Sequence, residues 1–285
     1  MESRIDALYS MMSPCVLCPR MCKALRSAGG LGFCGIGAEP VVSSAGPHLG
    51  EERVLVGTGG SGTIFFSGCN LACVFCQNYQ ISHLRQGRPV SVERLARTML
   101  ALEEAGCQNV NLVSPTHIIP PVARAITMAR SMGLTVPIVY NTGGYDRVET
   151  LRLLEGLIEI YMPDMKYADG LVAGQLSQAP DYPQVNRAAV LEMHRQVGDL
   201  QVVDDIAVKG LLVRHLVLPN DMAGSRAILD FLAEQVSPRT AVNVMAQYRP
   251  CYKAFDDPRI SRPPTRDEVT AVKAYARNKG LTLID

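Results

Sequence analysis

The sequence predicts an α/β fold in which helices cover a mainly parallel sheet. From residue 63 onward, short apolar runs alternate with amphipathic stretches, and the runs are apolar on both faces. Residues 1–60, by contrast, are rich in glycine and cysteine and show little periodicity. Right-handed crossovers between parallel strands favour a barrel or open barrel of about six βα units, fewer than the eight of a closed (β/α)8 barrel. An open doubly wound sheet is the alternative.

The elements of this fold are predicted in chain order from their periodicity. A first strand at 63–67 (TIFFS) leads into a cysteine-rich loop, and the longest apolar run, at 211–218, is the fifth strand. The six predicted strands span residues 63–67, 109–113, 136–140, 158–163, 211–218 and 241–245. The predicted helices span residues 91–105, 120–132, 148–154, 184–197, 225–235 and 265–278. The last helix begins with a capping box, because Glu268 follows Thr265 by three positions.

Two segments are predicted to lie outside this regular pattern. The stretch up to residue 183 that follows the fourth strand is rich in Ala, Gly, Pro and Tyr, and it is expected to be irregular. Residues 1–60 are predicted to form a Cys-rich metal-binding segment, and residues 61–285 the barrel domain.

Composition and charge exclude several classes of protein. The 285 residues can bury a large core, and 28 Lys and Arg against 27 Asp and Glu give no electrostatic reason to bind nucleic acid or a membrane surface. The first residues lack the apolar core of a signal peptide, and no run approaches the ~18 apolar residues of a membrane span. Nine cysteines without a secretion signal predict a cytoplasmic, metal-binding protein rather than a disulfide-bonded one.

The most informative motif is a cysteine triplet directly after the first predicted strand. Cys69, Cys73 and Cys76 have the spacing C-x3-C-x2-C. Three thiolates can hold three irons of a 4Fe–4S cluster, whereas a fully ligated cluster needs four, so one iron is left open to a small molecule. A partial zinc site or chance clustering is the alternative interpretation.

This triplet, with Phe75 directly before its last cysteine, resembles the signature of the radical S-adenosylmethionine (SAM) superfamily. The resemblance implies a six-unit partial barrel and two cofactors, a 4Fe–4S cluster and SAM, whose methionine amine and carboxylate chelate the open iron. It implies that one electron, from a reductant such as flavodoxin or ferredoxin, cleaves SAM. The 5′-deoxyadenosyl radical so formed would abstract hydrogen from a substrate.

The residues around the triplet narrow the resemblance. The segments GCNL (68–71) and CQN (76–78) are similar to the cluster loop of the glycyl-radical-enzyme activating branch, and most closely to uncharacterised homologues of pyruvate formate-lyase activating enzyme. This likeness extends over nearly the whole chain. It implies that the hydrogen donor could be a glycine Cα in a partner protein.

Polar residues at the ends of the predicted strands are the candidate cofactor-binding groups. In βα barrels the chemistry collects at the carboxyl ends of the strands, and a buried arginine or Asp–Lys pair is costly without partners. A zwitterionic cofactor would supply such partners. The candidates are Phe75, Asn78, Ser114, Thr116, His117, Asn141, Thr142, Asp164, Lys166, Arg214 and Gln247. Alternatively, Asp164 and Lys166 pair only with each other, and His117 serves as a cap.

Two departures from the activating branch concern these candidates. Asn141 occupies the position of an aspartate that helps bind a monovalent cation in that branch, so the resemblance leaves this cation site undecided. A Gly-Gly-Glu motif that often meets the cofactor amine is absent, and residues 114–117 (SPTH) take its place. The resemblance therefore implies that a hydroxyl or an imidazole replaces the carboxylate.

Four further cysteines, Cys15, Cys18, Cys22 and Cys34, precede the barrel. Four thiolates can close a tetrahedral zinc site or ligate a complete 4Fe–4S cluster. The long gap before Cys34 slightly favours a structural zinc knuckle. Zinc and a 4Fe–4S cluster both remain possible occupants of this site. The rival to the enzymatic interpretation is a non-catalytic iron–sulfur protein that transfers electrons or senses oxidation. Such a protein would not need the polar strand ends.

Overall fold

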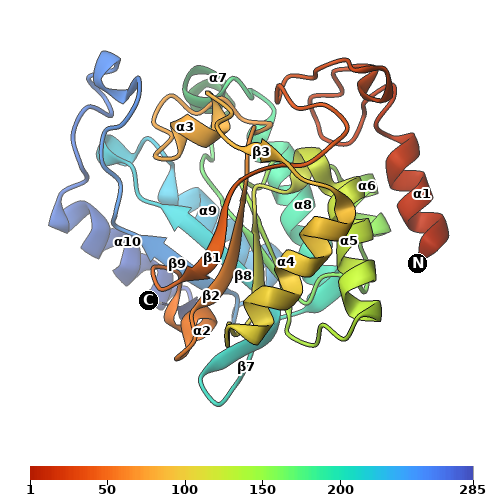
Figure 1. Ribbon diagram of the computed structural model, residues 1–285. Helices are drawn as coiled ribbons and strands as arrows, with labels where there is room; N and C mark the ends of the chain where they lie inside the picture. Colours follow the sequence, from red (N-terminus) through yellow and green to blue (C-terminus); the bar gives the residue numbers. More distant parts are fainter. Residues whose placement is uncertain (285) are drawn as a thin grey trace.

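One ten-stranded sheet forms the centre of the molecule (Figure 1). The computed structural model describes residues 1–284. The strands are β1 (Val41–His48), β2 (Ser61–Phe66), β3 (Arg88–Pro89), β4 (Val110–Val113), β5 (Ile138–Thr142), β6 (Ile160–Pro163), β7 (Gln201–Val203), β8 (Ile206–Leu216), β9 (Ala241–Met245) and β10 (Thr282–Leu283). Their order in the sheet is β10-β9-β8-β6-β5-β4-β2-β1-β3, and β7 pairs with β8.

The central strands of this sheet are parallel. Strands β2, β4, β5, β6, β8, β9 and β10 pair in parallel, whereas β1 is antiparallel to β2 and to β3, and β7 is antiparallel to β8. Among the described residues β10 and β3 are the outer strands of the sheet, which is therefore not closed. The prediction of an α/β fold with an open, partial barrel is confirmed. The carboxyl ends of the parallel strands consequently lie at one end of the molecule.

Most of the helices cover the outer face of the sheet. The helices are α1 (Glu2–Ser10), α2 (Arg53–Val56), α3 (Tyr79–Ser82), α4 (Val92–Glu104), α5 (Ile119–Ser131), α6 (Val148–Leu153), α7 (Gly170–Ser177), α8 (Tyr182–Val197), α9 (Ser225–Phe231) and α10 (Arg266–Asn278). Helix α2 lies instead on the inner side of the sheet, and α3 and α7 lie beside the cysteine loop. The outward strand residues, such as Ile64, Leu112 and Val213, belong to one large buried core with the helices. The predicted capping box is present at the start of α10, where Thr265 and Glu268 each bond the other's backbone.

Apolar side chains fill the inner side of the sheet near the amino ends of its strands. Leu55 of α2 is fully buried there against Val139, Ile160 and Leu212, near the starts of β5, β6 and within β8. Asn109 fixes this arrangement by donating from Nδ2 to the Leu55 carbonyl oxygen at 2.7 Å. Any cavity inside the sheet therefore opens toward the carboxyl ends.

Two segments expected to be irregular contain regular structure. The stretch after β6, expected to be irregular, contains α7, whose first turn is capped by Asp169 through bonds from the backbone amides of Leu171 and Val172. The supposedly aperiodic first 60 residues contain α1 and β1. Helix α1 buries only Ile5 and Leu8, which is too short a stripe to stand out as a helical pattern. None of the helices in residues 1–284 has the length and apolar character required to cross a bilayer.

Candidate active site

The cysteine loop follows β2 through a turn that only glycine accommodates well. Gly68 has φ +80°, and a side chain there would lie 2.8 Å from the carbonyl oxygen of Cys34. The loop then bonds to the end of α7, because Val74 N donates to the Leu176 carbonyl at 2.9 Å. These contacts hold the triplet against both the N-terminal segment and α7.

The three thiols of the triplet line one cavity of about 350 Å³ at the carboxyl ends of the strands. Ser177 donates from Oγ to the Cys73 sulfur at 3.0 Å, and the Ser82 hydroxyl lies 3.1 Å from the Cys76 sulfur. Burial raises the pKa of Cys69 to about 12 and also raises that of Cys73. Without a metal the thiols of Cys69 and Cys73 would stay protonated, whereas a bound metal would displace their protons.

The arrangement of these thiols fits a cluster that is bound through separate irons. Within residues 1–284, no three or more His, Cys, Asp or Glu side chains converge as the ligands of a single metal ion would. In a 4Fe–4S cluster each thiolate binds a different iron, so the sulfurs lie around the cluster rather than around one point. Three thiols facing a common cavity, each in contact with few other polar groups, meet that requirement.

A charged network forms another part of the cavity wall. Lys166 Nζ lies 2.6 Å from Asp164 Oδ2, and Arg214 Nε donates to Asp164 Oδ1 at 3.2 Å. Arg214 Nη2 also donates to Asn141 Oδ1 at 3.0 Å. Burial alone would raise the pKa of Asp164, but the Lys166 and Arg214 charges hold it below its usual value. Asp164 is therefore a buried carboxylate with two cations, and the structure brings these four predicted residues together.

Glu51 is a member of this network that sequence reasoning missed. Its Oε2 lies 3.4 Å from Arg214 Nη1, and its side chain is 8% exposed. Burial raises the pKa of Glu51, although Arg214 opposes the change. Nothing in the residues after β1 signals that they return to the inside of the sheet. Here the tertiary fold, and not a local motif, creates the site.

Thr116 and Thr142 direct their hydroxyls away from the charged network to a buried carboxylate. Asp146 accepts from Thr116 at 2.7 Å, from Thr142 at 2.7 Å and from the Tyr140 hydroxyl at 2.9 Å. Burial raises the pKa of Asp146, and these hydroxyls offset part of that effect. Thr142 still lines the cavity, whereas Thr116 does not.

His117 lies behind the cysteine loop and does not line the cavity. It is 2% exposed, and its Nε2 is 2.8 Å from the Ser67 carbonyl oxygen, so Nε2 is the protonated nitrogen. Burial lowers the pKa of His117 to about 4. Its surroundings are those of a structural histidine that supports the residue two positions before Cys69.

This histidine is expected to make stability fall in mild acid. The unfolded chain takes up the proton near the reference pKa of 6.5, whereas the folded chain resists protonation down to about 4. The contribution is therefore present above pH 6.5 and is lost as the pH falls toward 4. His117→Gln, which keeps a donor for Ser67, should lose about 2 kcal/mol less stability between pH 7 and pH 5 than the unaltered protein. Urea unfolding at both pH values measures the difference, and equal losses would contradict the assignment.

The remaining predicted residues, Phe75, Asn78, Ser114 and Gln247, also line the cavity. Gln77, which was not among the predicted residues, lines it too, and its Nε2 donates to the Gln247 carbonyl at 3.2 Å. Phe75 is 5% exposed and packs edge-to-face on two tyrosines, Tyr167 and Tyr248. These contacts fix the cysteine loop from the side of β9. Their roles toward a cofactor stay predictions.

Helix α8 fastens the ends of β5 and β6 at the site. The Tyr182 hydroxyl lies 2.8 Å from the Gly143 carbonyl, and Asn186 Nδ2 donates to the carbonyls of Gly144 and Asp164 at 2.9 Å each. Gly144 has φ +74°, and a side chain there would collide with the Asp164 carbonyl oxygen. The position of Asp164 thus depends on the absence of a side chain at Gly144.

Gly144→Ala is expected to destabilise the fold by clearly more than the left-handed conformation alone costs. Gly156→Ala is the matched control, because Gly156 has φ +79° and nothing within 4 Å of the added methyl group. The control should cost about 1–2 kcal/mol, the usual penalty for a side chain in this conformation. Gly144→Ala should exceed it, as measured by urea unfolding. Equal losses of unfolding free energy for the two variants would show that the ends of β5 and β6 are not closely packed at Gly144.

The four N-terminal cysteines also lie close together. A side chain at Gly32 would be 2.8 Å from the Cys22 sulfur and 3.8 Å from the Cys34 sulfur. Burial raises the pKa of Cys18 to about 12, and the other three cysteines add to it. The fold therefore brings the four thiols into one segment, three of them buried and Cys22 exposed. Within residues 1–284 they do not converge on one point as the ligands of a single metal ion would.

Arg26 places a buried positive charge beside these thiols. It is 1% exposed, and its Nη1 lies 3.8 Å from the Cys15 sulfur and 2.5 Å from the His117 carbonyl oxygen. Its Nε donates to the Gly37 carbonyl at 3.0 Å, and no carboxylate within residues 1–284 forms an ion pair with it. A buried cation is costly without an anion. Thiolates around a metal would provide that negative charge.

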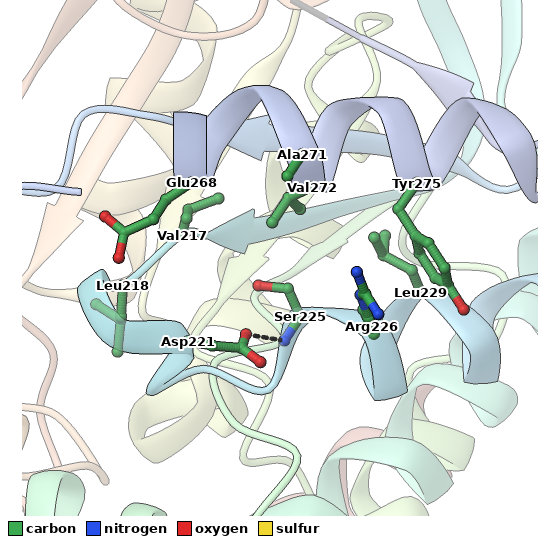
Figure 2. A pocket seen from close by; sticks show the side chains of 10 residues that line it. All are labelled: Val217, Leu218, Asp221, Ser225, Arg226, Leu229, Glu268, Ala271, Val272 and Tyr275. Carbon is green, nitrogen blue, oxygen red and sulfur yellow. Dashed lines mark hydrogen bonds between the residues drawn. The ribbon is translucent and has the colours of Figure 1, made fainter. Parts of the chain in front are cut away.

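A second cavity, of about 320 Å³, lies outside the sheet between α10 and the segment around α9 (Figure 2). Asp221 Oδ1 accepts from the Ser225 backbone amide there at 3.0 Å. The Ser225 hydroxyl is 2.8 Å from His215 Nε2, and His215 Nδ1 is 2.8 Å from the Met165 carbonyl oxygen. None of the predicted site residues lines this cavity. The candidate active site is therefore the cavity at the cysteine loop.

Comparisons with known proteins agree with this geometry. The model of the radical SAM superfamily matches residues 63–167. An uncharacterized protein of Methanocaldococcus jannaschii is 31% identical over 294 residues, covering 100% of this chain and 80% of the relative. The fold is similar to a radical SAM methyltransferase from Sphaerobacter thermophilus, with a TM-score of 0.54, 14% identity and coverage of 78% of this chain and 65% of that one.

A further solved structure with this fold is Streptococcus suis SuiB bound to S-adenosylmethionine. Its TM-score is 0.53 at 13% identity, and the match covers 75% of this chain and 47% of that one. The chain thus spans less than two thirds of the length of these solved structures.

Proposed function

The chain belongs to the radical SAM superfamily, and on this premise we propose that it reductively cleaves S-adenosylmethionine to start hydrogen abstraction. The observation that carries the proposal is the cavity that joins two sets of groups. Cys69, Cys73 and Cys76 line one part of it, and the buried Asp164, Lys166 and Arg214 network lines another. An enzyme that binds a cluster and a zwitterionic cofactor side by side needs both sets.

The chain's own residues would hold, orient and shield the cofactors. The three thiols would bind the 4Fe–4S cluster, and Asp164 offers carboxylate oxygens to an ammonium group or to ribose hydroxyls. Lys166 and Arg214 offer donors to a carboxylate. When bound, the cluster and SAM supply the hard chemistry, one-electron cleavage of the sulfonium to methionine and a 5′-deoxyadenosyl radical. The apolar floor around Leu55 closes the opposite end and keeps bulk water from that side.

The finer assignment concerns the substrate. We propose that the hydrogen comes from a glycine Cα of a partner protein, as in the glycyl-radical-enzyme activating branch. The segments GCNL (68–71) and CQN (76–78) of this chain resemble the cluster loop of that branch. We also place the protein in the cytoplasm, because all nine cysteines are unpaired and a reducing compartment keeps them so. A glycyl radical seen by electron paramagnetic resonance (EPR) in a co-purified partner tests the substrate. Its absence with every candidate partner would remove the activating role alone.

Product analysis separates this enzyme from a non-catalytic iron–sulfur protein. The purified protein is reconstituted with iron and sulfide without oxygen, reduced with dithionite and given SAM. Chromatography should then show 5′-deoxyadenosine and methionine. A protein with an intact, reduced cluster that forms neither product would be an electron carrier or a redox sensor.

We further propose that the four N-terminal cysteines bind a second metal centre, either zinc or a 4Fe–4S cluster. The buried Arg26 beside Cys15 supports this, since no carboxylate of residues 1–284 pairs with it. Metal analysis of the purified protein distinguishes zinc from additional iron and sulfide.

Cys18→Ala is expected to lose the N-terminal metal and to keep cleavage driven by dithionite within about tenfold. The reason is that Cys18 belongs to a separate set of thiols, and no cysteine of that set lines the cavity. The measurement combines metal content with 5′-deoxyadenosine formation. Complete loss of cleavage in a folded variant that retains its main cluster would instead assign the N-terminal site an obligatory role in electron transfer.

A further inference from the structure

The outer surface of the N-terminal module, residues 13–38, is unusually apolar. The module forms the loops at the upper right of Figure 1. Its exposed large side chains are Met21, Leu25, Leu31 and Phe33, at 46%, 57%, 64% and 38% exposure. Cys22, next to Met21, is exposed as well. Apolar side chains concentrated on one small module indicate a surface that another protein covers.

The charges that this module presents to solvent are positive. No Asp or Glu occurs between residues 7 and 38, whereas Lys23 is exposed and Arg20 is half-buried. Arg26 is buried and adds nothing to this surface. Arg85 adds a further charge at the edge, because its Nε donates to the Cys34 carbonyl at 3.3 Å. A basic and apolar surface is complementary to an acidic partner with an apolar contact area.

One side chain connects this surface to the cysteine loop. The Arg20 guanidinium lies 3.9 Å above the Phe33 ring, and its Nε donates to the carbonyl of Asn70 at 2.8 Å. Asn70 directly follows Cys69. Arg20 Nη2 also donates at 3.2 Å to the carbonyl of Ser177, whose hydroxyl bonds the Cys73 sulfur. The surface therefore lies directly behind the thiols of the site.

No residue of the module lines the cavity. A substrate docked on this surface would have no opening through which to reach the reacting atoms. An electron requires no such opening, only a short path through packed atoms. The position behind the loop consequently favours an electron donor over a hydrogen donor as the occupant.

We propose that this surface is the docking site of the one-electron donor, a small acidic flavin or iron–sulfur protein. The inference rests on the proposed function, because each cleavage consumes one electron from outside. In the docked pair, the donor's reduced flavin or iron–sulfur centre loses one electron and is oxidised. The cluster held by Cys69, Cys73 and Cys76 gains that electron, and no bond is made or broken in the transfer.

Surface variants test the docking site with flavodoxin as the probe. The double variant Leu25→Ser with Leu31→Ser removes apolar area, and Lys23→Glu reverses an exposed charge. The matched controls are Leu49→Ser, whose side chain is 72% exposed, and Lys209→Glu, also exposed. Leu49 follows β1 beside the amino end of β2, at the opposite end from the cysteine loop.

Two readouts are taken for every variant. Fluorescence anisotropy of labelled flavodoxin measures its binding without any turnover, and 5′-deoxyadenosine formation is followed with reduced flavodoxin and separately with dithionite. The module variants should bind flavodoxin about tenfold more weakly, equivalent to about 1.4 kcal/mol. Lys23→Glu should also flatten the salt dependence of association. Dithionite-driven cleavage should stay within about twofold of the unaltered protein for all variants.

The outcomes separate this inference from the proposed function. Module variants that bind flavodoxin as tightly as the controls, while dithionite still drives cleavage, would overturn the docking site and leave the function intact. The docking site would also be overturned if neither reduced flavodoxin nor reduced ferredoxin supported cleavage by the unaltered protein. Absence of cleavage with dithionite in the unaltered protein would instead overturn the function on which it rests.

Discussion

Cys73→Ala is expected to abolish cleavage of S-adenosylmethionine, with a fall of at least about 1,000-fold, as when a group indispensable to a reaction is removed. Cys73 is the most buried thiol of the triplet at 8% exposure, and its sulfur accepts a bond from Ser177. With two thiolates left, the cluster would lose one of its three anchors. Iron and sulfide content, together with 5′-deoxyadenosine formation, measures the loss.

Cys107→Ala is the matched control for this substitution. Cys107 is also buried, at 3% exposure, but it belongs to the main core and lies outside the cavity. This variant should retain its iron and its activity, with only a modest loss of stability from the missing sulfur. A Cys73→Ala protein that still assembles the cluster and cleaves SAM would contradict the assignment of the triplet.

Asp164→Asn is expected to damage both stability and cofactor binding. Asp164 is the carboxylate between Lys166 and Arg214, at 2.6 and 3.2 Å, so its neutralisation leaves two buried cations with less compensation. Breaking a buried ion pair in this way usually costs about 3–5 kcal/mol. Glu51, which also contacts Arg214, should keep the loss toward the lower end of that range. Urea unfolding measures it.

The control for Asp164→Asn is Asp257→Asn. Asp257 pairs with Arg259 at 2.6 Å on the surface, where such pairs contribute within about 1 kcal/mol. Affinity for SAM, measured by calorimetry on the cluster-loaded protein, should fall at least about tenfold for Asp164→Asn and stay unchanged for Asp257→Asn. Equal effects of the two substitutions would show that Asp164 has no special part in the site.

The regular part of the fold could be predicted because its strands are apolar on both faces. The runs at 63–67, 109–113 and 241–245 correspond to β2, β4 and β9 within a few residues. Strand β1 could not be predicted, since its sequence VVSSAGPH has no alternation and it forms by pairing with β2 and β3. Helix α7 was missed because glycines and a nearby proline obscure a helix that Asp169 caps.

The cysteines of the site could be predicted from their spacing, and its charged residues because a charged side chain is costly to bury without a partner. Asp164, Lys166, Arg214 and Asn141 indeed form one network. Glu51 could not be predicted as a site residue, because no local motif marks it. Only the tertiary fold brings its side chain to Arg214. The orientation of hydroxyl and imidazole groups was not predictable either.

Thr116 and His117 illustrate this last point. Both follow a strand end, as a cofactor-binding residue would, yet the short helix that contains them turns their side chains from the cavity. Thr116 bonds Asp146, and His117 bonds the Ser67 carbonyl. Sequence position gives the end of the sheet at which a residue lies, whereas the buried partner decides the direction of its side chain.

The most direct test is whether the reduced cluster binds SAM at an iron without a protein ligand. Electron–nuclear double resonance of the reduced protein with SAM labelled with nitrogen-15 at the methionine amine measures this contact. The account predicts a nitrogen coupling that appears with the labelled cofactor and disappears in Cys73→Ala together with the cluster. A 4Fe–4S signal unchanged by SAM, or a protein that takes up no cluster at Cys69, Cys73 and Cys76, would contradict it.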